Sequence, residues 1–325
     1  MTAGIRQAVD ADAILEQALG ALDGQGEALV TVRDAALTRF ANSRIHQNVS
    51  EHDATLRLRV VDGARQGVAS TNRLDAEGIG EVVRRASEMC RRAAPHPDPT
   101  PLAPAEAGGL ASELGHAAAT ATAEPERRAE GARAVIDAAL QAELEASGAF
   151  STEAGTLAIG NTNGLRSRHA TTQAKLLTVM TGADGSSGYA QAVSTDVGEI
   201  DAAAVGEEAA DKARRAAGAS DLEPGEYQVV LEEYAVATIL EYLAWAGFSA
   251  LAVEEGRSFM ELGEQVMGRN VSIWDDGMDP SGTPSAIDFE GVAKQRVELV
   301  TDGVANAVVH DSATARRAGT TSTGH

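Results

Sequence analysis

A proline-rich segment constrains this chain more than any other stretch of its sequence. Residues 95–104 read PHPDPTPLAP and hold five of the nine prolines in the 325-residue chain. Proline has no backbone N–H to donate and a fixed φ, so such a stretch neither continues a helix nor takes a central place in a sheet. We therefore predict an extended connection here and place the first domain boundary at it.

The sequence around this connection predicts an α+β fold in three domains, covering residues 1–100, 101–223 and 224–325. The first is expected to be an α/β domain, because helical spacing of apolar residues alternates with strand patterns. Residues 62–66 are expected to form a loop longer than a tight hairpin turn. The predicted helices lie near residues 14–22 and 74–94, and the strands at residues 28–33, 55–61 and 67–70.

The second domain is predicted to mix helices with strands, and the third to be rich in strands. A boundary at Pro224-Gly225 separates them. Asp201 is a predicted N-cap, because a carboxylate there accepts a free backbone N–H of the first helical turn. The predicted helices cover residues 125–147, 201–217 and 232–246; the strands cover residues 156–160, 165–181, 227–231 and 271–274; a hairpin turns at Asp302-Gly303.

The charge balance excludes some classes of partner. Lys and Arg number 27 and Asp and Glu number 48, which gives a formal charge of −21. An acidic surface repels phosphate, so we expect neither direct nucleic-acid binding nor docking on anionic membranes. No apolar run reaches membrane-spanning length, and the first ten residues do not read as a secretory signal. A cytoplasmic location is expected.

The residues that most often carry chemistry are scattered. Cys90 is the only cysteine, and the seven histidines show no helix-borne metal pair. His46 and His52 are six residues apart on an extended segment, too far to share a metal. A group of carboxylates between residues 275 and 290 has the oxygen ligands that a hard cation prefers. Turn-forming roles for these acids are the favoured interpretation, because Asp commonly stabilises turns.

An ordered set of short motifs resembles a known family. Arg39 to Gln47 (RFANSRIHQ) precedes Leu58 to Gly63 and then Gly67 to Asn72 (GVASTN). Later come Asn163-Gly164, Gly263-Glu264, Asp275-Asp276, Asp288 to Gly291 (DFEG), Asp302-Gly303, Thr314-Ala315 and Ser322 to Gly324 (STG). Their order and spacing are similar to the TldD/TldE family, in which TldE is also called PmbA. The resemblance runs from about residue 28 to the end.

The resemblance implies a two-subunit peptidase in which one subunit, TldD, carries zinc on a His-Glu-x-x-x-His helix. In such a motif the histidines bind the metal and the glutamate acts as the general base. The positions here that match it best are Glu241, Tyr242 and Ala246. Neither histidine is present. Tyr242 cannot replace the carboxylate that acts as the general base, because a tyrosine hydroxyl stays protonated at neutral pH. The chain is therefore identified as similar to TldE, the subunit without the zinc motif.

Family members normally continue beyond the Ser-Thr-Gly motif, so the resemblance implies that the third domain is incomplete. If the omitted part supplies strands, the third domain has unpaired strand edges.

Three functions stay open at this point. The leading hypothesis is a non-catalytic subunit that docks a TldD-type partner and acts with it on extended or unfolded peptides. Zinc is then expected in the partner, with no cofactor in this chain. Asp288, Glu290 and Gly291 are candidate contributors to a shared substrate site or interface, and turn capping is an equal alternative for them. The other hypotheses are an active metal-dependent peptidase that uses other residues, and a non-enzymatic binding or scaffold protein.

Overall fold

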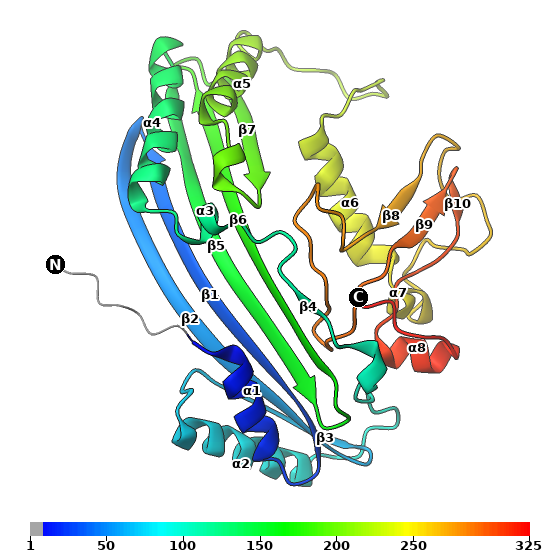
Figure 1. Ribbon diagram of the computed structural model, residues 1–325. Helices are drawn as coiled ribbons and strands as arrows, with labels where there is room; N and C mark the ends of the chain where they lie inside the picture. Colours follow the sequence, from blue (N-terminus) through cyan, green and yellow to red (C-terminus); the bar gives the residue numbers. More distant parts are fainter. Residues whose placement is uncertain (1–8) are drawn as a thin grey trace, which may run out of the picture.

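The computed structural model describes residues 9–325 and confirms the α+β class (Figure 1). Its largest element is a seven-stranded sheet of order β3-β2-β1-β5-β6-β4, in which β7 also pairs with β6. The strands are β1 (Gln25–Ala41), β2 (Arg44–Asp62), β3 (Arg65–Thr71), β4 (Ala111–Ser112), β5 (Glu145–Asn161), β6 (Arg166–Thr181) and β7 (Ser187–Ser194). Short helical turns connect some of them: η1 (Ala105–Ala107), α3 (Ala118–Ala121) and η2 (Val197–Glu199).

The sheet consists of two similar halves. The first runs α1 (Ala11–Gly20), β1, β2, β3, α2 (Ala76–Arg92), and the second runs α4 (Pro125–Gln141), β5, β6, β7, α5 (Ala202–Arg215). The central strands β1 and β5 pair antiparallel, and Asp34 lies opposite Ala154. The pair Arg39↔Gln47 of the first half corresponds to Ile159↔Ser167 of the second, an offset of 120 residues in both strands. An approximate two-fold axis therefore passes through the sheet near Asp34.

The outer strand of each half touches its closing helix through a glycine. A Cβ on Gly67 of β3 would lie 2.2 Å from the Ala86 carbonyl oxygen and 2.3 Å from the Cys90 nitrogen of α2. A Cβ on Gly188 of β7 would meet the backbone of α5 in the same way, 2.1 Å from the Ala209 oxygen. Only glycine allows strand and helix backbones to come so close.

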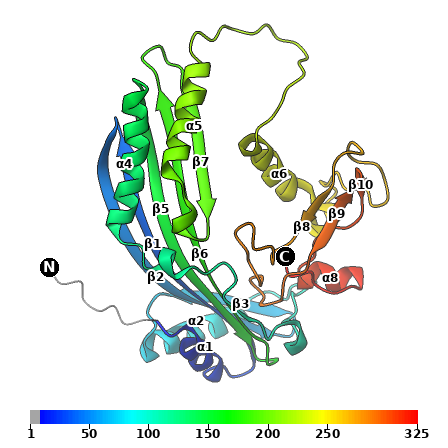
Figure 2. The ribbon, with the colours of Figure 1, turned by 45° about the horizontal axis from the view of Figure 1, so that its top comes forward.

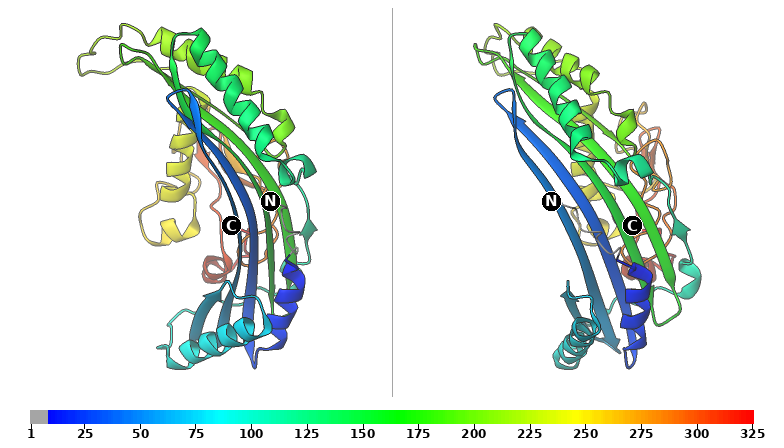
Figure 3. Two further views of the ribbon diagram at one scale, coloured as in Figure 1. Left: turned by 90° about the vertical axis from the view of Figure 1, so that its left-hand side faces the viewer. Right: turned by 60° about the vertical axis from the view of Figure 1, so that its left-hand side comes forward.

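The four helices cover one face of the sheet, and the third segment, residues 224–325, lies against the other (Figures 1 and 3). Side chains alternate between the faces, as a strand requires. Ala28 and Val30 pack under α1 and α2, whereas Leu29 between them packs with Ile287 and Val292 of the third segment. None of the helices in residues 9–325 is long and apolar enough to cross a membrane.

The third segment contains three helices and a small sheet of order β10-β9-β8. Its elements are α6 (Glu233–Gly247), α7 (Ala250–Glu254), β8 (Ile273–Asp275), β9 (Val297–Thr301), β10 (Val304–Ala305) and α8 (Ser312–Ala318). The predicted helix at residues 232–246 and the hairpin turn at Asp302-Gly303 are confirmed. Residues 216–232, which precede α6, form a long irregular connection from α5 (Figure 2).

The start of α6 is attached to the second half of the sheet. The Tyr234 hydroxyl donates to the carbonyl oxygen of Gln191 in β7 (3.1 Å), and its ring packs edge-on against Tyr189. Lys212 of α5 forms an ion pair with Glu232 at 2.6 Å. These contacts fix one end of the third segment.

Several predicted elements need correction. The predicted strand at residues 227–231 is wrong: these residues are irregular, and Val230 is 97% exposed. A strand needs a partner backbone for its hydrogen bonds, and none lies beside this stretch among residues 9–325. The turn between β2 and β3 is a tight one after all, because Asp62 pairs with Arg65 and Gly63 takes a positive φ of 56°.

Other elements differ from the predictions only in their bounds. The helix expected at residues 125–147 ends at Gln141, and β5 begins at Glu145. The N-cap at Asp201 is confirmed, since its carboxylate accepts the Ala204 N–H at 3.0 Å. Residues 95–104 form no helix or strand, as predicted, and the strands of the first two predicted domains share one sheet across them.

The glycine contacts give a stability prediction. We expect Gly67→Ala and Gly188→Ala each to lower the free energy of unfolding by roughly 1–3 kcal/mol, because the new methyl group overlaps helix backbone that has little room to move. Gly80→Ala is the matched control: it lies in α2 with nothing within 4 Å of the new Cβ, and should raise stability by about 0.5–1 kcal/mol. Urea unfolding measures all three. Equal stability of Gly67→Ala and Gly80→Ala would contradict the close packing.

Candidate functional site

Asp288 organises the loop that joins the third segment to the large sheet. Its Oδ1 accepts the N–H of Glu290 at 2.9 Å and the N–H of Val292 at 2.8 Å. Its Oδ2 is buried and has no hydrogen-bond partner among the described residues. Burial raises the pKa of Asp288 to about 6; the charge of Glu290 adds to the rise, while the two N–H bonds and Lys294 oppose it.

Glu290 connects this loop to α8 and to the sheet. Its Oε2 accepts the N–H of Ser312 at 2.9 Å, which satisfies a free donor at the start of α8. It also faces Glu27 of β1, whose charge is paired with Arg59 at 3.1 Å. Burial raises the pKa of Glu27, whereas Arg59 lowers it and Glu290 raises it further.

Gly291 has no side chain, and this lets the loop pack directly against the sheet. It has a φ of +80°, and a Cβ there would lie 2.6 Å from side-chain atoms of both Ile159 and Leu165. Its carbonyl oxygen accepts the Ser167 hydroxyl at 2.7 Å. A residue with a side chain would be strained at this φ and would overlap the sheet.

The three residues chosen from the sequence therefore lie together in one loop. The turn-capping role weighed for Asp288 is seen directly in its two N–H bonds. A role for Asp288, Glu290 or Gly291 in substrate binding or subunit contact stays a prediction.

A groove of about 750 Å³ opens beside this loop. One wall is the proline-rich segment with Pro101 and Leu102, another is the extended stretch that begins at Val292, and the third is α8 with Ala315 and Arg316. The lining combines apolar side chains with a few polar groups, which is typical of ligand sites. Sequence reasoning missed this groove, because its walls come from segments that lie far apart in the chain.

Side chains hold the proline-rich wall in place through its carbonyl groups. Arg59 and Gln66 donate to the Thr100 carbonyl oxygen, both at 3.2 Å, and Asn161 donates to the Ala103 oxygen at 2.8 Å. Asp98 forms ion pairs with Arg316 and Arg317 of α8. A segment rich in proline offers acceptors but few donors, so donors from the sheet fix its path. The run of prolines, which lack N–H donors, is the sequence signal for this anchoring.

The helix matched to the zinc motif has neither of that motif's histidines. Glu241 and Tyr242 are exposed on α6, and Ala246 has no ligand atom. A catalytic zinc site needs three protein ligands, usually with histidine among them. Across residues 9–325, no group of three His, Cys, Asp or Glu side chains is arranged to hold a metal ion. The residues at these positions do not fit a zinc ion.

Two of the other carboxylates near residue 280, Asp276 and Asp279, serve local turns, whereas Asp275 pairs with His325 at 2.9 Å. Asp276 accepts the Met278 N–H at 3.0 Å, and Asp279 accepts the Ser281 N–H at 2.8 Å. These are the Asx turns that Asp favours in loops. Cys90 is buried against β3, and burial raises the pKa of its thiol, which disfavours a nucleophilic role.

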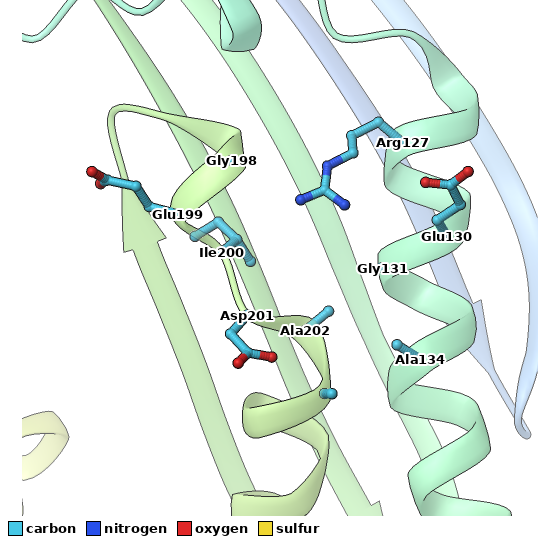
Figure 4. A pocket seen from close by; sticks show the side chains of 10 residues that line it. Arg127, Glu130, Gly131, Ala134, Gly198, Glu199, Ile200, Asp201 and Ala202 are labelled. Atoms are coloured by element: carbon cyan, nitrogen blue, oxygen red, sulfur yellow. The ribbon is translucent and has the colours of Figure 1, made fainter.

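A second hollow, of about 430 Å³, lies between α4 and the start of α5 (Figure 4). Arg127 extends from α4 toward Ile200 and donates to the Val197 carbonyl oxygen at 3.1 Å. Glu130 and Asp201 also line it. Asp201 already caps its own helix, so the residues here are used for structure.

Two models of one family match this sequence. The PmbA/TldA metallopeptidase domain 1 matches residues 26–90, and the PmbA/TldA metallopeptidase C-terminal domain matches residues 224–325. The chain belongs to the PmbA/TldD family. An uncharacterized protein from Methanocaldococcus jannaschii is 39% identical over 100 residues, which are 30% of this chain. The matched part of the chain spans about a quarter (24%) of the length of that curated relative.

Solved structures share the fold. TldE from Thermococcus kodakarensis superposes with a TM-score of 0.82 at 18% identity, over 96% of this chain and 72% of that one. A protein from Bacteroides thetaiotaomicron VPI-5482, named as a candidate modulator of DNA gyrase, gives 0.83 at 20% identity, over 96% and 74%. A protein of similar name from Thermotoga maritima MSB8 gives 0.80 at 19%, over 92% and 70%.

Asp288 gives a pH prediction. Its pKa in the folded chain lies above 3.8, the ordinary value of an Asp side chain, so the folded state favours the protonated carboxyl. This stability is fully present below about pH 4 and is lost as the pH rises through about 6. We expect the free energy of unfolding to fall by about 1–2 kcal/mol more in the natural chain than in Asp288→Asn between pH 5 and pH 7.5. Urea unfolding at several pH values measures the difference.

Asn keeps an oxygen that accepts both N–H groups but carries no charge, so it is the matched variant. Parallel pH profiles for the two proteins would contradict a raised pKa at Asp288.

Proposed function

We propose that this chain is the TldE-type, non-catalytic subunit of a two-subunit cytoplasmic zinc peptidase. The observation that carries the proposal is the composition of α6. Glu241, Tyr242 and Ala246 stand where the family motif has its ligands and base, and they supply no histidine. Family membership supports a peptidase context, and the missing donors support a partner that holds the zinc.

In this proposal the chain docks a TldD-type subunit and lines a shared cavity that takes extended or unfolded peptides. The groove beside the loop at residues 288–291 supports this role, because its size suits a few residues of a peptide. Asp288, Glu290 and Gly291 act by holding that groove to the sheet. The net charge of −21 argues against direct contact with DNA, so an effect on gyrase of the kind named for two of the solved relatives would be indirect.

Reconstitution with a TldD-type subunit from the same organism tests the proposal. We expect the isolated chain to contain no stoichiometric zinc and to cleave no peptide, and the mixed complex to cleave unfolded peptides. A chelator should abolish that cleavage. Tyr242→Phe in this chain should leave the activity of the complex unchanged, because the hydroxyl of an exposed tyrosine on α6 has no part in the proposed chemistry.

Two outcomes would overturn the proposal. Chelator-sensitive peptidase activity in the isolated chain would show an active enzyme that uses other residues. Failure to bind any TldD-type subunit, with no activity gained, would favour a separate binding or scaffold function.

A further inference from the structure

Carboxylates hold two walls of the groove at the residues where those walls begin. Asp288 Oδ1 accepts the N–H of Val292, the first residue of the extended wall, at 2.8 Å. Glu290 Oε2 accepts the N–H of Ser312, the first residue of α8, at 2.9 Å. The two acids are separated by one residue in the same loop, so both walls are fixed from one place.

A third carboxylate holds the proline-rich wall through an arginine. Glu27 pairs with Arg59 at 3.1 Å, and both side chains are nearly buried. Arg59 in turn donates to the carbonyl oxygens of Thr100 at 3.2 Å and Pro101 at 3.3 Å. The position of this wall therefore depends on Glu27, which keeps Arg59 in place.

The three carboxylates also act on one another, and Glu290 is the member they share. Burial raises the pKa of both Glu27 and Asp288, and the charge of Glu290 raises each of them further. Like charges in a junction with little water repel one another strongly. The acids that hold the three walls are therefore coupled through their charges.

The surrounding cations decide where a proton goes. Arg59 and Arg57 both favour the charged form of Glu27. Only Lys294 does so for Asp288, whose Oδ2 is buried with no hydrogen-bond partner among residues 9–325. A buried oxygen without a partner is costly when it carries charge. Asp288 is therefore the member of the group that takes up a proton first.

We infer that Glu27, Asp288 and Glu290 act together as a pH-sensitive clamp on the groove, in which a proton on Asp288 holds the three walls tightly and its release loosens them. The proton neutralises the unpartnered oxygen and removes a charge beside Glu290. Glu290 then keeps its bond to the start of α8 with less repulsion from its own loop. The clamp consists of contacts within this chain, so it does not depend on the proposed function.

Hydrogen exchange of the whole chain, followed by mass spectrometry and corrected for the intrinsic effect of pH on exchange, tests this inference. We expect peptides that contain Val292, Ser312 and residues 100–107 to exchange about ten-fold more slowly at pH 5 than at pH 7.5. A pKa of about 6 in place of 3.8 gives a factor of about this size over that interval. Asp288→Asn carries no charge at either pH, so it should exchange slowly at both.

Glu290→Gln tests the coupling between the carboxylates. It keeps an oxygen for the Ser312 N–H but removes the shared charge, so the pH midpoint of all three walls should move to a lower value. Glu106→Gln is the matched control, because Glu106 is an exposed carboxylate that lines the same groove outside the clamp. It should keep the pH profile of the natural chain.

Three results would overturn the inference. Exchange in the natural chain could be independent of pH after the correction, or the change could be confined to the peptide with Val292, in which case Asp288 acts only on its own turn. An unchanged midpoint in Glu290→Gln would show that the carboxylates are independent. The profiles of the natural chain and Glu290→Gln decide the matter even if Asp288→Asn does not fold. The measurement uses no partner and no peptide substrate, so its failure would leave the proposed function standing.

Discussion

The pairing of β1 with β5 is the interaction on which the rest of the structure depends. This ladder runs from Glu27↔Asn161 to Phe40↔Gly148 and joins the two halves into one sheet. It sets which side chains face the helices and which face the third segment, because a shift of one residue would exchange the two sets. Leu29 and Ile159 lie in it directly opposite each other, and both belong to a buried cluster with Ile287 and Val292 of the third segment. The register therefore also positions the candidate site.

Much of the fold was predictable where a pattern is local. The helices near residues 74–94 and 201–217 follow from apolar spacing, and both exist as α2 and α5. The N-cap at Asp201 was also predicted, whereas Asp75 as the cap of α2 is seen only in the structure. The strand at residues 227–231 was wrong because its apolar composition says nothing about a partner backbone. The length of β1 and β5 was underestimated, since polar residues in mid-strand obscure the alternation.

The candidate site was predictable only in part. The motif at residues 288–291 led to the right loop, but its contacts with Ile159 and Ser167 depend on packing between distant segments. The groove beside it was not foreseen for the same reason. The motif positions on α6 could be interpreted from the sequence alone. Tyr242 and Ala246 do not provide the histidine ligands of the zinc motif, whatever residues surround them.

The central ladder also has a consequence for the order of folding. Each half pairs its own three strands through short connections, whereas Glu27 and Asn161 lie far apart in sequence. Closing such a long loop lowers the chain entropy before the contacts between β1 and β5 can offset that loss. The two halves should therefore form first as separate folding units, and their union into one sheet should be the slow step. Until that step each half exposes an unpaired central strand, so a newly synthesised chain is then most open to aggregation.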